Sequence, residues 1–435
     1  MIETAYHAFV DIPVLYKILG ALGCILILNA YLRQLGVSIA TGAILLAFWS
    51  GHSLNAALDI AWTRFTSLDN ICLLIIVFQV IWLSNLMKRT GAMAALVLAV
   101  RARVSHRKAI AALPAIIGML PMPGGAIFSA PLVDDCDTEK VIDPLLKTRI
   151  NYWFRHIWEY WWPLYPGVLL AIEISNVDIW QFTLVQFPMS VLAVGVGAWF
   201  LLRKVPCPED SGEQQHKPQD KPLLPLLAPV ITVVIVYALV RVCFPQIAAI
   251  TRYAPMIAGL AAGILILQLQ HPLGRKEWKE VLTSKRTFTM AALVALVRIY
   301  GAFIESELPN GHLLIDEMRL ELAAGGVPVT IIIMAVPFLS GLATGIAVGF
   351  IGASFPIVFS LLGTDPGLAE TLPTIVLAFG FGYMGMILSP VHICLIVTNE
   401  HFSTRIMKSL RGLMLPALTM LTCVTAVYAL CQLLF

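Results

Sequence analysis

Apolar stretches recur along almost the whole length of this 435-residue chain. Ten of them are about 20 residues long, the length that an α-helix needs to cross the roughly 30 Å hydrocarbon core of a bilayer. Only 13% of the residues are charged, against about 25% in soluble domains. The sequence therefore predicts an all-α, multi-pass protein of the cell inner membrane with about ten transmembrane helices. The stretches are centred near Leu26, Leu45, Val77, Pro163, Val191, Val234, Leu260, Val294, Leu388 and Met420.

Lysine and arginine are concentrated in alternate loops between these stretches. We place the N-terminus outside and let two segments enter the membrane and return on the same side. Of the 29 basic residues, 22 then fall in inside loops, 4 in outside loops and 3 within spans. This bias agrees with the positive-inside rule and predicts an external N-terminus. The net charge of +3 is small and spread over many loops, which argues against a nucleic-acid partner.

The chain divides into two halves that have the same parts in opposite orientation. Residues 1–204 and 223–435 each contain three spans, a re-entrant hairpin, a span interrupted by proline and a final span. Residues 205–222, rich in proline, glutamine and charge, are interpreted as a cytoplasmic linker. This order of parts predicts two inverted-topology repeats.

One segment in each half is too rich in glycine and proline for a straight helix. The first hairpin is expected at 108–131, where prolines remove backbone donors and glycines permit a sharp turn. The second is expected at 330–362, although glycines three to four residues apart could instead serve close helix packing. Three residues of the first hairpin match three of the second at one offset of 225 residues: Gly124, Ser129 and Pro131 with Gly349, Ser354 and Pro356.

Prolines also interrupt two spans near their centres, at WWPLYPG in residues 150–175 and at ILSPVH in residues 371–398. Irregular backbone at this depth persists only against protein or a hydrated cavity, where freed carbonyls and helix ends can bind ions and small anions. An ordinary proline kink is the alternative for either span alone. We expect hairpins and breaks to meet near the membrane midplane. The expected substrate-binding residues are Pro123, Gly124, Gly125, Ser129, Arg155, Tyr165, Thr344, Gly345, Gly349, Ser354 and Ser389.

The segments PMPGGAIFSAP and GLATGIAVGFIGASFP, together with the two interrupted spans, resemble the ion transporter superfamily. Its members include carriers of gluconate, citrate and dicarboxylates, and of sodium or arsenite. The two segments look most like an integral membrane branch catalogued as a domain of unknown function. The resemblance covers nearly the whole chain and implies a homodimer in which a mobile transport domain moves the solute past a scaffold. The Ser-Asn-Thr hairpin signature of the dicarboxylate branch is missing, so the resemblance implies neither dicarboxylate specificity nor sodium coupling.

Charged side chains at bilayer depth are costly and are therefore candidates for function. Arg155, His156 and Glu159 precede the first break, and His392 follows Pro390 in the second. Arg155 could attract an anionic solute, while the two histidines and Glu159 are proton-coupling candidates. The structural alternatives are an internal ion pair between Arg155 and Glu159 and histidines that serve packing.

Other charged groups are expected to have structural roles. Arg298 and Glu305 share a helix face and are expected to pair or to line a helix interface, and Glu173 is expected to be interfacial. An acidic run at 134–139 is interpreted as solvated charge rather than a metal site. The eight cysteines are scattered without a C-x-x-C pair, so neither a disulfide framework nor a zinc site is indicated.

The sequence thus favours a secondary active transporter of a small, carboxylate-type anion, coupled to H⁺ or Na⁺, without enzymatic activity or a cofactor. Its expected partners are the solute, membrane lipid and a second copy of the chain. An intramembrane enzyme is one alternative, but neither H-E-x-x-H nor G-x-S-x-G is present. A non-transporting membrane subunit is the other, and such a subunit would not need two interrupted spans.

Overall fold

The computed structural model describes residues 12–101, 103, 106–119, 125–137, 139–206, 223–363 and 366–434. Within these ranges every regular element is helical and no strand occurs. The helices are α2 (Val14–Leu32), α3 (Leu35–Trp49), α4 (Leu54–Thr66), α5 (Leu68–Arg89), α6 (Ala92–Arg101), α7 (His106–Gly118), α8 (Ala126–Asp135), α9 (Pro144–Arg155), α10 (Pro166–Ile174), α11 (Ile179–Phe200), α12 (Leu223–Cys243), α13 (Pro245–Ile250), α14 (Ala254–Gln270), α15 (Arg275–Leu282), α16 (Lys285–Ile304), α17 (Leu314–Ala324), α18 (Val329–Thr344), α19 (Ala347–Ser360), α20 (Leu368–Ile387), α21 (Ile393–His401) and α22 (Ile406–Leu434), with a 3-10 turn, η1 (Leu202–Lys204), after α11.

Seven helical segments in the described part of the chain are long and apolar enough to cross a membrane. They are α2, α5, α11 with η1, α12, α15 together with α16, α20 and α22. An eighth is possible if α17 and α18, bent by 114° relative to each other, form one span. The stretches near Leu45 and Leu260 form α3 and α14, apolar helices of 15 and 17 residues. These helices indicate a multi-pass membrane protein.

At both spans that the sequence predicts to be interrupted, a non-helical segment containing proline separates two helices. The segment 156–165 lies between α9 and α10, and it contains Pro163, while Pro166 is the first residue of α10. Proline is tolerated at that first position because the N–H there has no partner within the helix. The segment 388–392 lies between α20 and α21 and contains Pro390, which lacks the N–H needed to continue the helix.

Two helix pairs fold back on themselves. α18 packs against α19, and only Gly345 and Ile346 join them. Gly345 has a φ of +64°, which glycine adopts at little cost and other residues rarely adopt. α7 packs against α8 in the same manner. The turn predicted between them at Pro123 and Gly124 lies outside the described residues.

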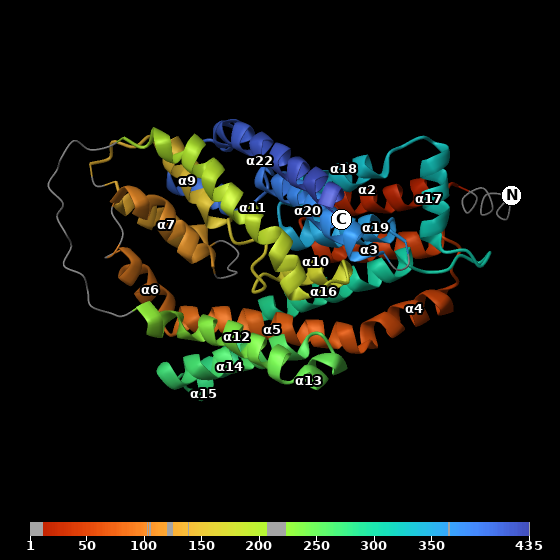
Figure 1. Cartoon of the computed structure of the whole chain (residues 1–435), viewed down its shortest axis with the longest axis horizontal. Coiled ribbons are helices and arrows are strands. Elements are labelled where there is room, and N and C mark those ends of the chain that lie inside the picture. Colours follow the sequence, from red (N-terminus) through yellow and green to blue (C-terminus); the bar gives the residue numbers. More distant parts are fainter. Residues whose placement is uncertain are drawn as a thin grey trace.

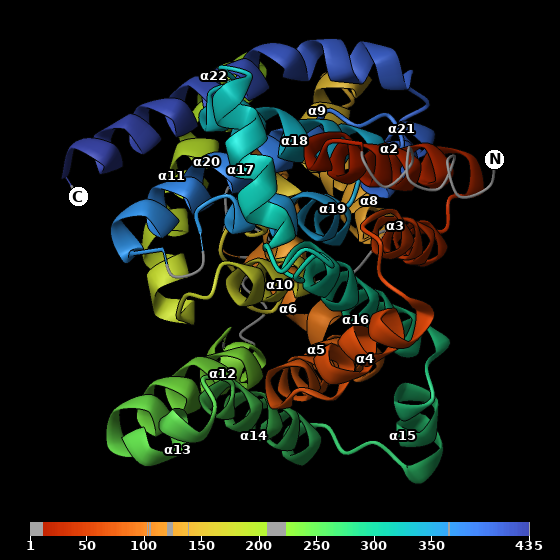
Figure 2. The same cartoon turned by 90° about the vertical axis from the view of Figure 1, so that its right-hand side faces the viewer.

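The helices form two groups that lie on either side of α16. In Figures 1 and 2, α12, α13 and α14 lie together beside α5, while α9, α11, α18, α20 and α22 lie on the opposite side. Helix α16 contacts α3, α4 and α5 as well as α19. Helix α20 is buried between α18 and α22, and a β carbon on Gly341 of α18 would lie only 2.2 Å from the carbonyl oxygen of Gly382. Small residues thus let α18 and α20 approach closely at the centre of this second group.

Candidate functional site

The helix breaks between α9 and α10 and between α20 and α21 meet at a pair of buried histidines. His156 follows the last residue of α9, and His392 caps the start of α21. Their Nε2 atoms are 3.0 Å apart, and their ring centroids are separated by 4.8 Å. Both side chains are at least 95% buried. The fold thus brings together two predicted proton-coupling candidates that are 236 residues apart in the sequence.

Two tyrosines form reciprocal hydrogen bonds across this junction. The hydroxyl of Tyr152 on α9 donates to the carbonyl oxygen of Ile387 at the end of α20, over 3.0 Å. The hydroxyl of Tyr383 on α20 donates to the carbonyl oxygen of His156 at the end of α9. Each tyrosine therefore satisfies a carbonyl group that the break in the other span leaves without a regular helical partner.

Arg155 is the last residue of α9 and lies beside this junction with only 2% of its surface exposed. Its Nη1 atom is 3.2 Å from Nε2 of His156 and 3.9 Å from Oε1 of Glu159. The guanidinium also packs against Gly125 at the start of α8, where a β carbon would lie 2.5 Å from Nη2. A buried cation and the positive end of a helix therefore share one location, and both attract an anion.

The turn of the second hairpin packs against the second break. A β carbon on Gly345 would lie 3.0 Å from Oγ of Ser389 and 3.0 Å from the backbone nitrogen of His392. The Ser389 hydroxyl donates to the carbonyl oxygen of Leu342 over 2.7 Å. Thr344, also near the turn, donates its hydroxyl to the carbonyl oxygen of Ser340 within α18. The predicted residues Thr344, Gly345 and Ser389 thus lie at this junction.

The remaining predicted binding residues lie in more varied positions. Ser129 on α8 is fully buried, and its Oγ has no hydrogen-bond partner among the described residues. Tyr165 donates its hydroxyl to the carbonyl oxygen of Gly118 at the end of α7. Ser354 is buried in α19, and its hydroxyl donates to the carbonyl oxygen of Phe350, one turn earlier, over 2.6 Å. Nothing is described for Pro123 and Gly124.

Gly349 has a local packing role. It lies in the first turn of α19, where a β carbon would be 2.6 Å from Oγ1 of Thr344. Glycine at this position therefore allows the two arms of the hairpin to lie close together next to their turn.

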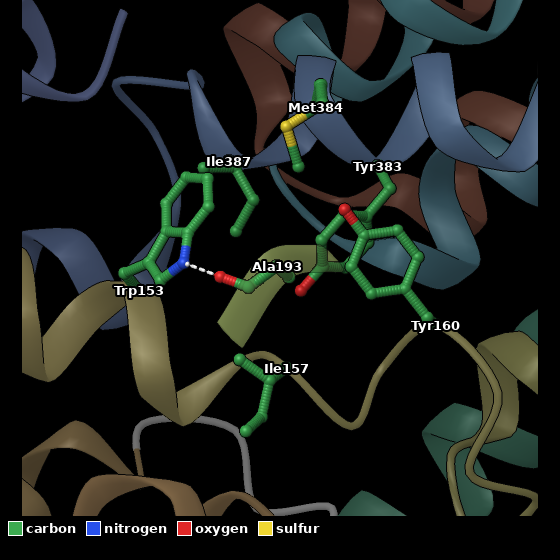
Figure 3. Close-up of a pocket in the computed structure, with 7 residues that line it drawn as sticks. All are labelled: Trp153, Ile157, Tyr160, Ala193, Tyr383, Met384 and Ile387. Atoms are coloured by element: carbon green, nitrogen blue, oxygen red, sulfur yellow. Dashed lines mark hydrogen bonds between the residues drawn. The ribbon is translucent and has the colours of Figure 1, made fainter. Parts of the chain in front are cut away.

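A small cavity lies next to the first break (Figure 3). The rings of Tyr160 and Tyr383 form one side, with centroids 4.2 Å apart. On the other side, Nε1 of Trp153 donates to the carbonyl oxygen of Ala193 over 2.8 Å. None of the predicted substrate-binding residues lines this cavity, which is lined by Trp153, Ile157, Tyr160, Ala193, Tyr383, Met384 and Ile387.

Sequence reasoning overlooked Cys394. This residue lies in the first turn of α21, is 95% buried, and places Sγ close to both histidines. One ligand atom from each of His156, His392 and Cys394 lies within 4.8 Å of the others. The only sequence signal for this proximity was the position of Cys394 two residues after His392.

Of the two expectations for Arg298 and Glu305, the pairing is wrong, whereas Arg298 does lie at an interface between helices. Arg298 instead contacts Glu173, with Nη2 2.6 Å from Oε1, and Glu305 pairs with Arg64. Glu173 also accepts a bond from Arg252 over 2.8 Å, and only 3% of its surface is exposed. Glu173 is therefore the centre of an ion-pair network that joins α10 to α16 and to the segment just before α14.

Comparison with known proteins identifies one family for almost the entire chain. A family model described as "Protein of unknown function (DUF401)" matches residues 16–431. This match agrees with the resemblance to a membrane branch of unknown function. No matching relative was found among curated proteins. With a match over nearly its whole length, the chain belongs to the DUF401 family.

Proposed function

We propose that this protein is a secondary transporter of a small, carboxylate-type anion, built on the plan of the ion transporter superfamily. The observation that carries the proposal is the contact between two broken spans, with Arg155 buried at the same point. Broken spans are rare in membrane proteins outside sites that handle ions or polar solutes, because their backbone groups need partners.

The reciprocal tyrosine bonds support two inverted repeats. Subtracting 152 from 383 and 156 from 387 gives the same offset of 231 residues. Exchanging the halves at this offset converts the bond from Tyr152 to Ile387 into the bond from Tyr383 to His156. The packing has the same symmetry, since α8 packs on α21 while its counterpart α19 packs on α10. In this proposal, α7–α8 and α18–α19 are re-entrant hairpins that enter from opposite sides.

The distribution of charge along the long axis supports an external N-terminus. The basic helix α15 lies at the same end of the molecule as α6 and α7, and α17 lies at the other (Figure 1). The start of α2 is at the α17 end, because Glu321 of α17 accepts bonds from the backbone nitrogens of Val14 and Leu15, each over 2.7 Å. By the positive-inside rule the α15 end is cytoplasmic, which fits an inner-membrane protein.

Arg155 is the proposed recognition group for the anion. Its guanidinium can form two parallel bonds to a carboxylate, and the start of α8 adds a positive helix end. The low dielectric of a buried site strengthens both interactions relative to water. Glu159 lies 3.9 Å from Nη1 and is the group that an incoming anion would replace as partner of Arg155.

Protons are the proposed driving ion. Nδ1 of His156 lies 2.6 Å from the carbonyl oxygen of Tyr152, and a carbonyl only accepts, so Nδ1 carries the hydrogen. In the neutral ring, Nε2 of His156 then carries a lone pair, which lies 3.0 Å from Nε2 of His392 and 3.2 Å from Nη1 of Arg155. A proton can be held between the rings, with Glu159 nearby to balance its charge. Sodium coupling is the second candidate, with backbone carbonyls and hydroxyls such as that of Ser129 as oxygen ligands.

The ion pairs of Glu173 lie where a mobile domain would meet a scaffold. In the proposed homodimer, α7–α11 and α18–α22 form the transport domain, and the helices around α5, α12, α14 and α16 form the scaffold. Glu173 belongs to the first group, and Arg252 and Arg298 belong to the second. These pairs would hold the observed conformation and would have to separate for alternating access.

A thermal-shift screen of the purified protein against carboxylates, sugar acids and inorganic anions tests the proposal. A ligand that binds only the folded state raises the melting temperature, and we expect at least one carboxylate to do so in the wild type but not in Arg155→Gln. A matched control is Arg64→Gln, which removes an arginine that is paired far from the breaks. Stabilisation that persists in Arg155→Gln would contradict the recognition role of Arg155.

A double variant separates the substrate role of Arg155 from a structural one. If Arg155 serves only as the partner of Glu159, removing it strands the buried carboxylate at a cost of roughly 3–5 kcal/mol. Combining Arg155→Gln with Glu159→Gln would then recover both stability and transport. Recovered stability without recovered transport is the result that the proposal predicts.

A further inference from the structure

His156, His392 and Cys394 form a cluster whose residue types match those of metal centres. One nitrogen of each ring and the Cys394 sulfur lie within 4.8 Å of one another, and all three residues are buried. Imidazole and thiolate together are typical ligands of zinc and related transition metals, whereas magnesium and calcium require oxygen ligands. Proton coupling needs only the histidines and assigns no role to Cys394.

The separations are close to those that a tetrahedral ion requires. With bonds of about 2.0 Å to nitrogen and about 2.3 Å to sulfur, neighbouring ligand atoms lie about 3.3–3.6 Å apart. The Nε2 atoms are 3.0 Å apart, so the rings need to separate by only a few tenths of an ångström. The widest separation in the cluster, 4.8 Å, has to close by about 1 Å, which a change of side-chain rotamer supplies.

A backbone carbonyl next to the cluster already fixes His156 in the tautomer that a metal ligand needs. Nδ1 of His156 bonds to the carbonyl oxygen of Tyr152 over 2.6 Å, which leaves the lone pair on Nε2, the atom nearest to His392. Hydrogen bonding of the second ring nitrogen to a carbonyl is the usual arrangement for histidines that bind metals. Nδ1 of His392 has no hydrogen-bond partner among the described residues, so this buried ring is incompletely satisfied in the protein alone.

The charges near the cluster permit a divalent ion. Cys394 lies in the first turn of α21, where the positive helix end stabilises an anionic thiolate. Glu159 contributes a second negative charge, with Oε1 3.9 Å from Nε2 of His156, and it is close enough to become a fourth ligand. Arg155, 3.2 Å from Nε2 of His156, opposes the ion. The thiolate and the carboxylate together offset two of the three positive charges that the ion and Arg155 carry, and Arg155 can remain within ion-pair distance of Glu159.

We propose that His156, His392 and Cys394 bind a zinc-type divalent transition-metal ion at the junction of the two broken spans. The ion replaces the direct contact between the histidines and joins the end of α9 to the start of α21. Because the ligands come from both halves of the chain, the bound ion holds the two breaks together. The proposal does not depend on which solute the protein transports, and the ion and the coupling proton are alternative occupants of the space between the two histidines.

The first experiment uses the wild-type protein in detergent, so it requires neither a transport assay nor a variant. The metal-free protein is titrated with Co²⁺, a spectroscopic substitute for Zn²⁺, and then with Zn²⁺. We expect one equivalent of Co²⁺ to produce the ultraviolet absorption of a thiolate-to-cobalt bond, and Zn²⁺ to abolish it by displacement. Absence of this absorption, or displacement by Mg²⁺ as readily as by Zn²⁺, would overturn the proposal.

Variants then locate the site. Cys394→Ser and His392→Gln should each lower the affinity for Zn²⁺ by at least about tenfold. Losing a residue that only hydrogen-bonds to a metal ligand already costs about that much, and losing the ligand itself should cost more. Cys72→Ser and His52→Gln are matched controls, because Cys72 is another buried cysteine and His52 bonds to Ser306 instead. The controls should bind Zn²⁺ as the wild type does. Equal affinities in all four variants would place the ion elsewhere and refute the assignment, while leaving the transport proposal intact.

Discussion

The reciprocal tyrosine bonds make a quantitative prediction about stability. Tyr152→Phe and Tyr383→Phe each remove one hydroxyl while keeping the buried ring. The two carbonyl acceptors differ in what remains to them. The carbonyl of His156 keeps a bond from the backbone nitrogen of Glu159 over 3.0 Å, so Tyr383→Phe should cost about 0.5–1.5 kcal/mol, the net value of one hydrogen bond.

The carbonyl of Ile387 has no such replacement within the described chain. Pro390 has no N–H, and the backbone nitrogen of Val391 is directed towards Oγ of Ser389, 3.4 Å away. Tyr152→Phe therefore leaves a buried acceptor unsatisfied, which should cost about 1–3 kcal/mol. The change at Tyr152 is thus expected to be the more damaging of the two.

The free energy of unfolding, measured by titrating the protein in mixed micelles with a denaturing detergent, tests this order. Tyr300→Phe is the matched control, because Tyr300 is fully buried and its hydroxyl has no hydrogen-bond partner among the described residues. It should leave stability unchanged or raise it slightly. If Tyr152→Phe is no more destabilising than Tyr300→Phe, the junction between the breaks does not exist as described.

Two further changes test the surroundings of the site. Gly345→Ala should lower the free energy of unfolding by about 1–2 kcal/mol, because alanine disfavours the left-handed backbone of this residue. It should also impair transport, because the added carbon meets the second break. Gly311→Ala is the control, since Gly311 has a similar φ of +83° with open space around it, and this change should lower stability alone. Glu173→Gln should lower stability by roughly 3–5 kcal/mol, because it strands a buried arginine, whereas Glu305→Gln, in a half-exposed pair, should cost less than about 1 kcal/mol. Thermal melting of each variant and its control, together with solute uptake for the glycine pair, measures these differences.

Helices that depend on local composition were predictable from the sequence. Six of the seven segments that are long and apolar enough to span a bilayer coincide with predicted spans, such as α5, while α20 ends where the span predicted around Leu388 was expected to have its centre. The end of α20 falls three residues before Pro390, because proline removes a backbone donor wherever it occurs, whereas α9 already ends at Arg155, well before Pro163. The short helices α3 and α14 show the limit of this reasoning, since at 15 and 17 residues they are shorter than the spans of about 20 residues that were predicted.

Contacts between distant segments were not predictable. Spacing along one helix favoured Glu305 as the partner of Arg298, but Glu305 follows the end of α16 and reaches Arg64, while Glu173 arrives from α10. The proximity of Cys394 to His156 likewise has no local signal, because the two are brought together only by the packing of α21 against α9. The spacing of residues within one segment carries no information about which distant segment packs against it, so such pairs could not be predicted.

The most direct test of the transport proposal is to measure whether the protein moves an anion across a membrane together with protons. Vesicles containing the protein are adsorbed on a solid-supported membrane, and the carboxylates that stabilise the protein are applied in the absence of sodium, with and without a pH gradient. We predict a transient current that needs the pH gradient, disappears with a protonophore, and is lost in Arg155→Gln. A current that requires sodium and ignores the pH gradient would reject proton coupling, and an equal current in Arg155→Gln would contradict the account of the site itself.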